Sequence, residues 1–267
     1  EVVASGREVV ANGSEEVAKC KPSGHEVETN KNKEEDEVIT FAYDINPNHR
    51  EIVMQLKIAS FVCDDIQDAV KEADLVILAV PVGAMKTVAS LIAPFLKNNT
   101  IVTDTGSTKG SVISDVNPYL SNNVYFIPSH PLAGTEYSGP KSGFSSLFEN
   151  RYWLIVCEKQ TNETKKLIKF FEKLGSIVEI VNTEYHDRIL AITSHLPHLI
   201  AYTIVGTASD LETDLKNDVI KFSASGPRIS NFLRGDKSVA IALSLQAVYS
   251  LIVPEFVKLL ANQKPLY

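Results

Sequence analysis

Two short polar segments of this 267-residue chain carry side chains that could do acid–base chemistry. The segment SHPLAGTE, residues 129–136, places His130 directly after the apolar run VYFIP. The segment TDTGSTKG, residues 103–110, places Ser107 and Lys109 after the apolar run TIVTD. A histidine after a strand can act as a general base near neutral pH. The alternatives are a loop histidine, which this motif alone leaves equally open, and for Ser107 the common role of a helix N-cap.

A carboxylate ends the apolar run VITFAY, residues 38–43. In a nucleotide-binding sheet, Asp44 at this place would accept hydrogen bonds from ribose hydroxyls and repel a 2′-phosphate, which favours NAD over NADP. The alternative is an aspartate that helps to start the next helix. Dinucleotide folds also place a G-x-G-x-x-G turn about 20 residues earlier. Here Gly6, Gly13 and Gly24 are isolated, and no apolar strand leads into any of them.

The segments AVPVG, residues 79–83, and TDTGSTKG end the next two apolar runs. Ligands of open parallel sheets bind beyond the carboxyl ends of the strands, where glycines permit close backbone approach. We therefore expect cofactor contacts from Pro81, Gly83, Thr105 and Gly106.

Further polar residues stand in the second half of the chain. His195 and His198 are three residues apart in SHLPH, but no HExxH pattern or third nearby ligand accompanies them, so we expect them to line a polar pocket and predict no metal site. Glu184 and His186 can be read equally well as cap and surface residues. Arg228, in SASGPR, is the side chain that a carboxylate substrate needs, although most arginines are simply exposed.

The elements that must position these residues alternate between positions 38 and 182. Continuous apolar runs separated by helical patterns predict a parallel, doubly wound, Rossmann-like α/β sheet. Residues 183–267 read as a smaller all-helical domain, with a kink at Pro197. The strands are expected at 38–43, 75–80, 100–104, 124–128, 152–157 and 176–181, and the helices at 46–57, 84–96 and 162–175. GSTKG opens a further helical pattern that runs through Val112, Ile113 and Val116. Residues 1–37 hold ten acidic and five basic residues, and the run GHEVETNKNKEEDE within them has no apolar period, which predicts a solvated loop or disordered tail.

Composition excludes several classes of protein. The net charge of −7 makes nucleic acid a poor partner. The longest apolar run, residues 239–253, is too short and too polar to span a membrane. Cys20, Cys63 and Cys157 form no disulfide framework or metal knuckle, so we expect a reducing, cytoplasmic location.

Taken in order, YDINPN, DLVILAVPVG, TDTGSTKG, SHPLAGTEYSG, HLPHLIAY and FSASG resemble the prephenate/arogenate dehydrogenase family of tyrosine biosynthesis, from about Val38 to Gly226. The resemblance implies a dinucleotide-binding domain followed by a helical domain that dimerises. It also implies oxidation of prephenate or arogenate with NAD, or alternatively NADP, and release of CO2 to give 4-hydroxyphenylpyruvate or tyrosine.

The resemblance assigns roles to single residues. His130 matches the catalytic histidine that contacts the ring hydroxyl, and Ser107 matches the serine that shares this contact. Glu136 and His198 match substrate-pocket residues, and Asp44 matches the ribose-binding carboxylate. Lys109 and Arg228 are the cations expected to bind the substrate carboxylates, with Arg151 as a further candidate.

Two alternatives follow from the same residues. The missing glycine fingerprint favours a non-catalytic family member that no longer binds a dinucleotide. A different Rossmann dehydrogenase acting on a hydroxy acid is a weaker alternative, because SHPLAGTE argues against it.

Overall fold

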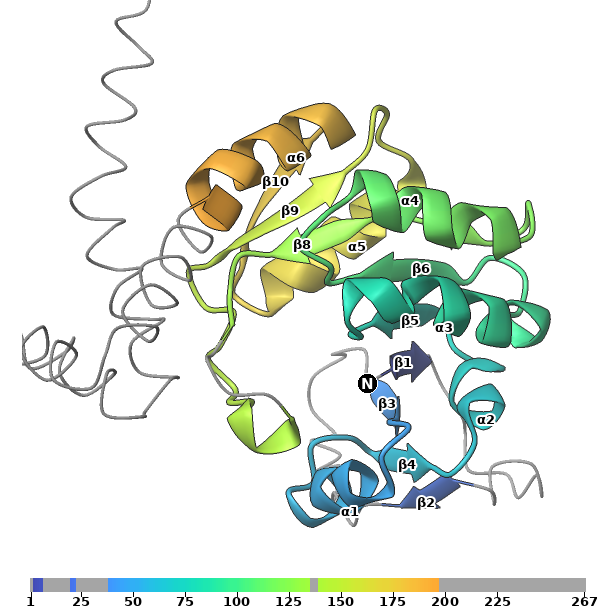
Figure 1. The fold of residues 1–267 in the computed structure, drawn as a ribbon. Coiled ribbons are helices and arrows are strands. Elements are labelled where there is room, and N and C mark those ends of the chain that lie inside the picture. Colours follow the sequence, from blue (N-terminus) through green and yellow to red (C-terminus); the bar gives the residue numbers. More distant parts are fainter. Residues whose placement is uncertain (1, 7–19, 23–37, 135–138, 197–267) are drawn as a thin grey trace, which may run out of the picture. The chain divides into compact units, whose positions relative to one another are not determined.

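The computed structural model describes residues 2–6, 20–22, 38–134 and 139–196. The chain divides into two compact units, residues 1–134 with 138–186, and residues 135–137 with 187–267. The described part of the first unit contains both sheets and the helices that cover them (Figure 1).

A seven-stranded sheet forms the body of the first unit, with the strand order β2-β4-β3-β1-β5-β6-β7. Three of its neighbouring pairs are parallel, namely β3 with β4, β5 with β6, and β6 with β7. These parallel strands come from the apolar runs that the sequence predicts as strands, together with a short run at 61–63 that it does not. The bounds are β1 (Val2–Gly6), β2 (Cys20–Pro22), β3 (Ile39–Tyr43), β4 (Phe61–Cys63), β5 (Leu75–Leu78), β6 (Ile101–Asp104) and β7 (Tyr125–Phe126).

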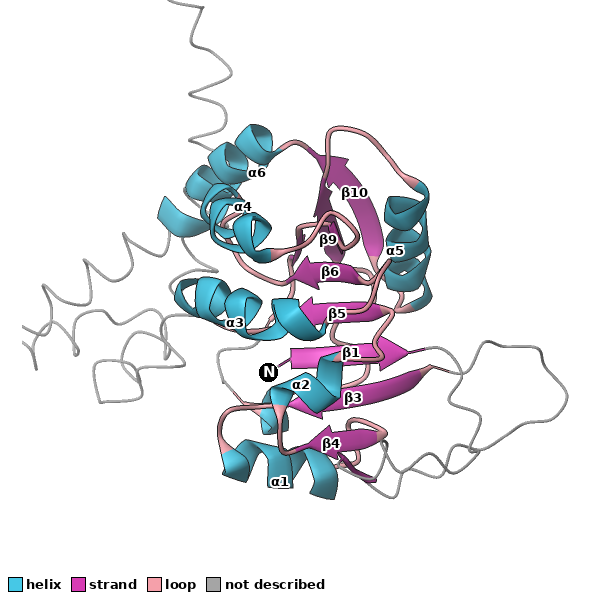
Figure 2. Ribbon diagram, turned by 90° about the vertical axis from the view of Figure 1, so that its right-hand side faces the viewer, coloured by secondary structure: helices cyan, strands magenta, loops and turns pink. Residues whose placement is uncertain are grey.

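Helices lie on both faces of this sheet (Figure 2). Alternate side chains of β5 explain the arrangement, because Val76 and Leu78 pack with α2, α3 and α4, whereas Leu75 packs with α5 on the opposite face. The α/β class and the winding on both faces are therefore as predicted. The helices are α1 (Pro47–Gln55), α2 (Ile66–Val70), α3 (Met85–Ile92), α4 (Gly110–Val116) and α5 (Asn162–Lys173).

The central strand runs against the direction of its neighbours. β1 pairs antiparallel with both β3 and β5, and Val2 is opposite Tyr43 on one side and Leu78 on the other. Gly6 is therefore at the edge of the sheet away from the carboxyl ends of β3 and β5. The prediction of a loop for residues 1–37 is wrong for Val2–Gly6 and for Cys20–Pro22, which form β1 and β2.

A separate three-stranded sheet, ordered β10-β9-β8, contains β8 (Ser129–Pro131), β9 (Tyr152–Val156) and β10 (Ile177–Val181). β9 and β10 are parallel, whereas β8 runs antiparallel to β9. The helix α5 begins with a reciprocal capping box between Thr161 and Thr164 and ends before Gly175, whose φ of 82° forms a left-handed turn. The sequence predicts a strand that ends at residue 128, so β8 is an additional strand that the sequence analysis does not predict.

Aromatic stacking joins α5 to the second sheet. The single tryptophan, Trp153, is 2% exposed and stacks on Phe171 with ring centroids 3.7 Å apart. This packing fixes the position of β9. Because β8 pairs with β9, the position of β8 is fixed as well.

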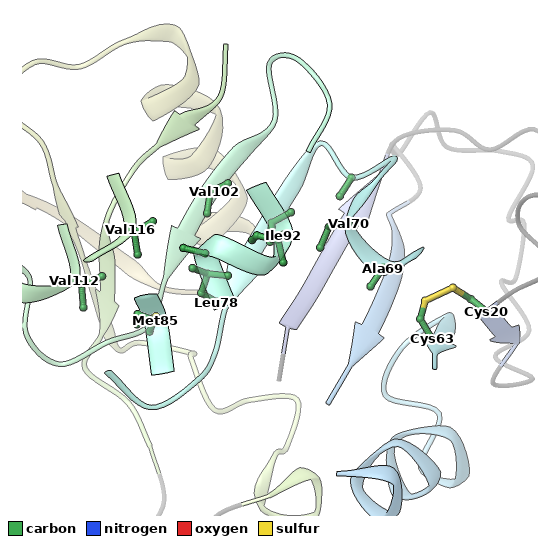
Figure 3. Close-up of a cluster of buried hydrophobic side chains, with 13 residues drawn as sticks. Cys20, Cys63, Ala69, Val70, Leu78, Met85, Ile92, Val102, Val112 and Val116 are labelled. Atoms are coloured by element: carbon green, nitrogen blue, oxygen red, sulfur yellow. A yellow bond between two sulfur atoms is a disulfide. The ribbon is translucent and has the colours of Figure 1, made fainter. Parts of the chain in front are cut away.

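A disulfide joins Cys20 of β2 to Cys63 of β4 at the margin of the main core (Figure 3). The sequence analysis expected no disulfide, because 43 residues separate the two cysteines and nothing in their spacing marks them as partners. Antiparallel pairing of β2 with β4 brings them opposite each other. Cys157 is free.

The helix α6 (Thr183–Leu190) continues as a π-helix over Ala191–His195. The hydroxyl of Thr193 donates to the Ile189 carbonyl at 2.8 Å within this irregular stretch. The change of helix type stands just before the predicted kink at Pro197, which itself lies outside the described residues, as does the rest of the expected helical domain. Among the described residues, none of the helices is long and apolar enough to cross a membrane.

Candidate functional site

Three strands deliver their carboxyl ends to one edge of the main sheet. Tyr43 and Leu78 are both opposite Val2, and Leu78 is the parallel partner of Asp104, so the ends of β3, β5 and β6 are level with one another. The segments after these strands carry most of the predicted cofactor contacts. This edge is therefore the candidate site within the first unit.

Asp44 follows β3 and is buried. One carboxylate oxygen accepts a hydrogen bond from the Asn46 backbone N–H at 2.7 Å, and the other is 3.1 Å from Nδ1 of His49. The side chain of Asn46, in turn, caps α1 by accepting from the Asn48 N–H. Asp44 thus helps to start the helix, as the alternative interpretation held. That role is compatible with binding a ribose, because each carboxylate oxygen can accept more than one hydrogen bond.

A largely apolar pocket extends from Asp44 between the sheet and α1. Its lining comes from β3, β4, α1 and the loop after α1, and comprises Thr40, Ala42, Tyr43, Asp44, Arg50, Val53, Ile58, Ala59 and Val62. The guanidinium of Arg50 donates to the Asp44 carbonyl at 2.7 Å, which keeps this cation at the mouth of the pocket.

The turn after β6 differs from the predicted helix cap. α4 begins at Gly110, and Ser107 is exposed without a capping role. Gly106 is buried, and its N–H donates to the Asp104 carboxylate at 2.8 Å. A Cβ at Gly106 would lie 2.9 Å from that carboxylate, whereas a Cβ at Gly83, after β5, meets nothing within 4 Å. Gly106 is therefore required by packing, while Gly83 borders open space as a ligand-facing position would.

Lys109 is not available as a substrate cation, which corrects the prediction. Its side chain is completely buried, and Nζ donates to the Asp104 carboxylate and, at 2.6 Å, to the Ser129 carbonyl. Burial raises the pKa of the Asp104 carboxyl above its usual value, and the Lys109 ammonium opposes that rise. The pair connects the end of β6 to β8.

Both the hydroxyl and the backbone N–H of Ser129 make buried hydrogen bonds. Its hydroxyl donates to the Asp104 carbonyl at 2.8 Å, is 2.9 Å from the Thr103 hydroxyl, and accepts from the Trp153 indole N–H at 2.9 Å. Its backbone N–H donates to the Asp104 carboxylate at 3.2 Å. The residue that follows, His130, is consequently attached to a fixed strand.

His130 is half-buried on β8, and its Nδ1 is 3.0 Å from Nε2 of His186. His186 is on α6 and is 0% exposed. The expectation that His186 is a surface or cap residue is therefore wrong. The neighbouring Glu184 is exposed and does not share this environment, because residues two apart on a helix point in different directions.

Three predicted site residues, Glu136, His198 and Arg228, lie outside the described residues. Pro81 is exposed and Thr105 is half-buried at the edge formed by β5 and β6. Sequence reasoning missed Asp104, Ser129 and His186. An aspartate that ends a strand five residues before a lysine is a signal for the first, but nothing in the sequence pairs His186 with His130. Within the part of the chain that the structure covers, no three His, Cys, Asp or Glu side chains gather to hold a metal.

The described residues fit a dinucleotide at its two ends. Asp44 suits the ribose of the adenosine half, and open space beside Gly83 lies at the edge that also carries Thr105 and Gly106. Between these places, β1 is antiparallel to both neighbours, so its carboxyl end with Gly6 is not at this edge. Its Gly6 is at the wrong edge to approach a pyrophosphate.

Comparisons with known proteins identify both parts of the chain. Residues 30–180 match the family model described as prephenate dehydrogenase, nucleotide-binding domain, and residues 182–234 match prephenate dehydrogenase, dimerization domain. The cyclohexadienyl dehydrogenase of Zymomonas mobilis is 41% identical over 194 residues, which are 72% of this chain and 66% of that protein. Other curated relatives are matched over 32% to 50% of their length.

Solved structures give the same result. The crystal structure of prephenate dehydrogenase from Aquifex aeolicus has a TM-score of 0.61 and 31% identity, with 83% of this chain and 85% of that chain covered. A crystal structure of the A. aeolicus enzyme in complex with hydroxyphenyl propionate and NAD+ has a TM-score of 0.59 and 29% identity, covering 83% and 84%.

Proposed function

The chain belongs to the prephenate dehydrogenase family, and from that premise we propose that it oxidises prephenate or arogenate with NAD, or alternatively NADP, and releases CO2. The observation that carries the proposal is the placement of His130. It is half-buried on β8, in the same compact unit as Asp44 and the turn after β6. A general base requires such a position, partly shielded from water but able to reach a ligand.

The chemistry assigns a proton transfer to His130. When hydride leaves the ring carbon that bears the hydroxyl, the O–H proton passes to the imidazole of His130. Loss of CO2 then returns its bonding electrons to the ring, which becomes aromatic, and the phenolate oxygen takes the proton back. Ser107, exposed in the turn after β6, is proposed to hold the same oxygen. The bound nicotinamide supplies the hydride acceptor.

The substrate carries carboxylates, and the buried Lys109 cannot bind them, so other cations must do so. Arg228 remains the proposed partner, together with Glu136 and His198 as further pocket residues. Arg151 is a second cation of the first unit and is exposed just before β9. β8 ends one residue after His130, and Arg151 immediately precedes β9, the strand that pairs with β8.

An activity assay with a control variant tests the proposal. We expect NADH to form when the protein is given prephenate or arogenate with NAD, and His130→Asn to lower kcat by about 10²–10⁴-fold. Arg188→Gln is the control, on the part of α6 beyond the first unit. It should not lower the rate of NADH formation by a factor of that size. Equal rates for the parent protein and His130→Asn would remove this histidine from the mechanism.

Cofactor choice is a separate test. Asp44→Ala should weaken NADH binding, measured by NADH fluorescence, more than NADPH binding, because it removes a ribose acceptor and its repulsion of a 2′-phosphate. Equal weakening of both would show that Asp44 serves only to start α1.

The direction of β1 favours a second candidate, a family member that keeps the fold but does not hold a dinucleotide. The described residues offer no cradle for a pyrophosphate, since β1 delivers Gly6 to the opposite edge. Titration of NADH distinguishes the two candidates. Saturable binding supports the dehydrogenase, whereas no binding at millimolar NADH supports the second candidate.

Residues 182–234 match a dimerization domain, so we also propose a homodimer. Light scattering during gel filtration measures it directly. We also propose a cytoplasmic location for this biosynthetic enzyme. A Cys20–Cys63 disulfide in the isolated protein would argue against that location, because disulfides are rare in reducing compartments.

A further inference from the structure

The imidazole of His130 contacts a second imidazole. Nδ1 of His130 and Nε2 of His186 are 3.0 Å apart, and the ring planes are inclined by 60°. Hydrogen bonds between ring nitrogens require one protonated and one unprotonated nitrogen. The contact therefore leaves two arrangements for a pair of neutral rings: the Nδ1–H of His130 donates to His186, or the Nε2–H of His186 donates to His130.

Both partners are attached to fixed elements. His130 follows Ser129, whose hydroxyl and N–H are bonded to β6. His186 is in the first turn of α6, where the side chain of Asn182 accepts from the Tyr185 N–H at 2.8 Å and the Asn182 carbonyl accepts from the His186 N–H at 3.0 Å. The distance between the two rings is thus set by the backbone on each side.

Burial separates the roles of the two histidines. His186 is 0% exposed and cannot meet a substrate, whereas His130 is half-buried and presents its other nitrogen, Nε2, away from His186. For Nε2 of His130 to accept a proton, it must be the unprotonated nitrogen. The proton of the neutral ring must then be on Nδ1, where it is donated to His186.

We propose that His186 is a positioning residue that holds His130 in the Nδ1–H tautomer by accepting its hydrogen bond. The proposal rests on the proposed function, because the choice between the two tautomers follows from proton acceptance at Nε2 of His130. When His130 gains a proton at Nε2, the same Nδ1–H becomes a charge-assisted donor to His186, which stabilises the imidazolium. His186 must carry its own proton on Nδ1 for this arrangement.

Histidine ¹⁵N NMR of the protein without ligands tests the tautomer directly. Six histidines contribute signals, and those of His130 are identified by their loss in His130→Gln. In the parent protein at neutral pH we expect His130 to be protonated at Nδ1 and unprotonated at Nε2. A parent protein with His130 protonated at Nε2 instead would overturn the proposal.

Two substitutions of similar size separate the hydrogen bond from packing. His186→Gln keeps a polar group near the position of Nε2 and should retain the Nδ1–H form of His130. His186→Leu removes the acceptor and should shift His130 toward the Nε2–H form. Tyr185→Phe, at a 56% exposed neighbour on α6, is the control that should change nothing. An unchanged tautomer in folded His186→Leu, with Trp153 fluorescence like the parent's, would refute the assignment.

Kinetics give the functional arm. His186→Leu should lower kcat by about 10–100-fold with little change in KM, and His186→Gln should restore most of it. If the parent protein binds no dinucleotide and has no turnover, the proposed function fails while the NMR result still decides the pairing. A normal kcat in His186→Leu would show that the tautomer does not matter for the reaction.

Discussion

Lys109 and Asp104 form an ion pair that is closed to solvent at both side chains, and the Lys109 ammonium also bonds the Ser129 carbonyl at 2.6 Å. The pair thus ties the end of β6 and the start of α4 to β8, the strand of His130. Removing one charge leaves the other buried without its partner, which typically costs about 3–5 kcal/mol.

The ion pair predicts strong coupling between two substitutions. Lys109→Met and Asp104→Asn should each lower the free energy of unfolding by about 3–5 kcal/mol, and the double variant should lose less than their sum. Denaturant unfolding followed by Trp153 fluorescence measures all four proteins. Additive losses would contradict a direct interaction.

The Lys109→Met variant also has a signed pH dependence. Burial already raises the pKa of Asp104, and removing Lys109 removes its opposing effect. A carboxyl with a folded-state pKa above its unfolded value stabilises the protein below the unfolded pKa, and this contribution is lost as pH rises through the folded pKa. The deficit relative to the parent should therefore be larger at about pH 8 than at about pH 5. Equal deficits at the two pH values, or a larger deficit at about pH 5, would show that the pKa of Asp104 is not raised when Lys109 is absent.

Ser129 predicts a second loss of stability. Ser129→Ala removes the acceptor of the Trp153 indole N–H and the bond to the Asp104 carbonyl, so unfolding should become easier by about 1–3 kcal/mol. Ser90→Ala is the matched control, because its hydroxyl donates to the Thr87 carbonyl in an exposed hydrogen bond within α3. Equal effects of both changes on the unfolding midpoint would refute the role of the buried network.

Two glycines of the candidate site should respond differently to a methyl group. Gly106→Ala brings Cβ to 2.9 Å from the Asp104 carboxylate and should cost about 1–3 kcal/mol of stability. Gly83→Ala meets open space, so the melting temperature should stay near that of the parent. If a dinucleotide binds at this edge, Gly83→Ala should nevertheless weaken NADH binding. A lower melting temperature for Gly83→Ala would contradict the open space at Gly83, and its NADH binding could then not be interpreted.

The cysteines give a prediction that thiol titration checks. With two of the three cysteines in the disulfide, one thiol, Cys157, should react in the unfolded and unreduced protein, and three should react after reduction. Burial raises the pKa of the Cys157 thiol, so in the native protein its labelling should be slow near pH 8 and quicken as pH rises. Three thiols without reductant would exclude the disulfide and favour a reducing compartment.

The sequence by itself determined most of the alternating strands and helices from β3 to β10, though not β4, α2 or β8, and the position of His130 after an apolar run. The spacing of hydrophobic residues and the Pro and Gly residues that end elements are local signals, so they can be recognised without knowledge of the fold. The tertiary structure decided the reversed direction of β1, the Cys20–Cys63 bond, the burial of Lys109 and the contact of His186 with His130. Each of these depends on which distant segments become neighbours. A lysine or histidine looks the same in the sequence whether it faces water or a buried partner, and only packing determines which.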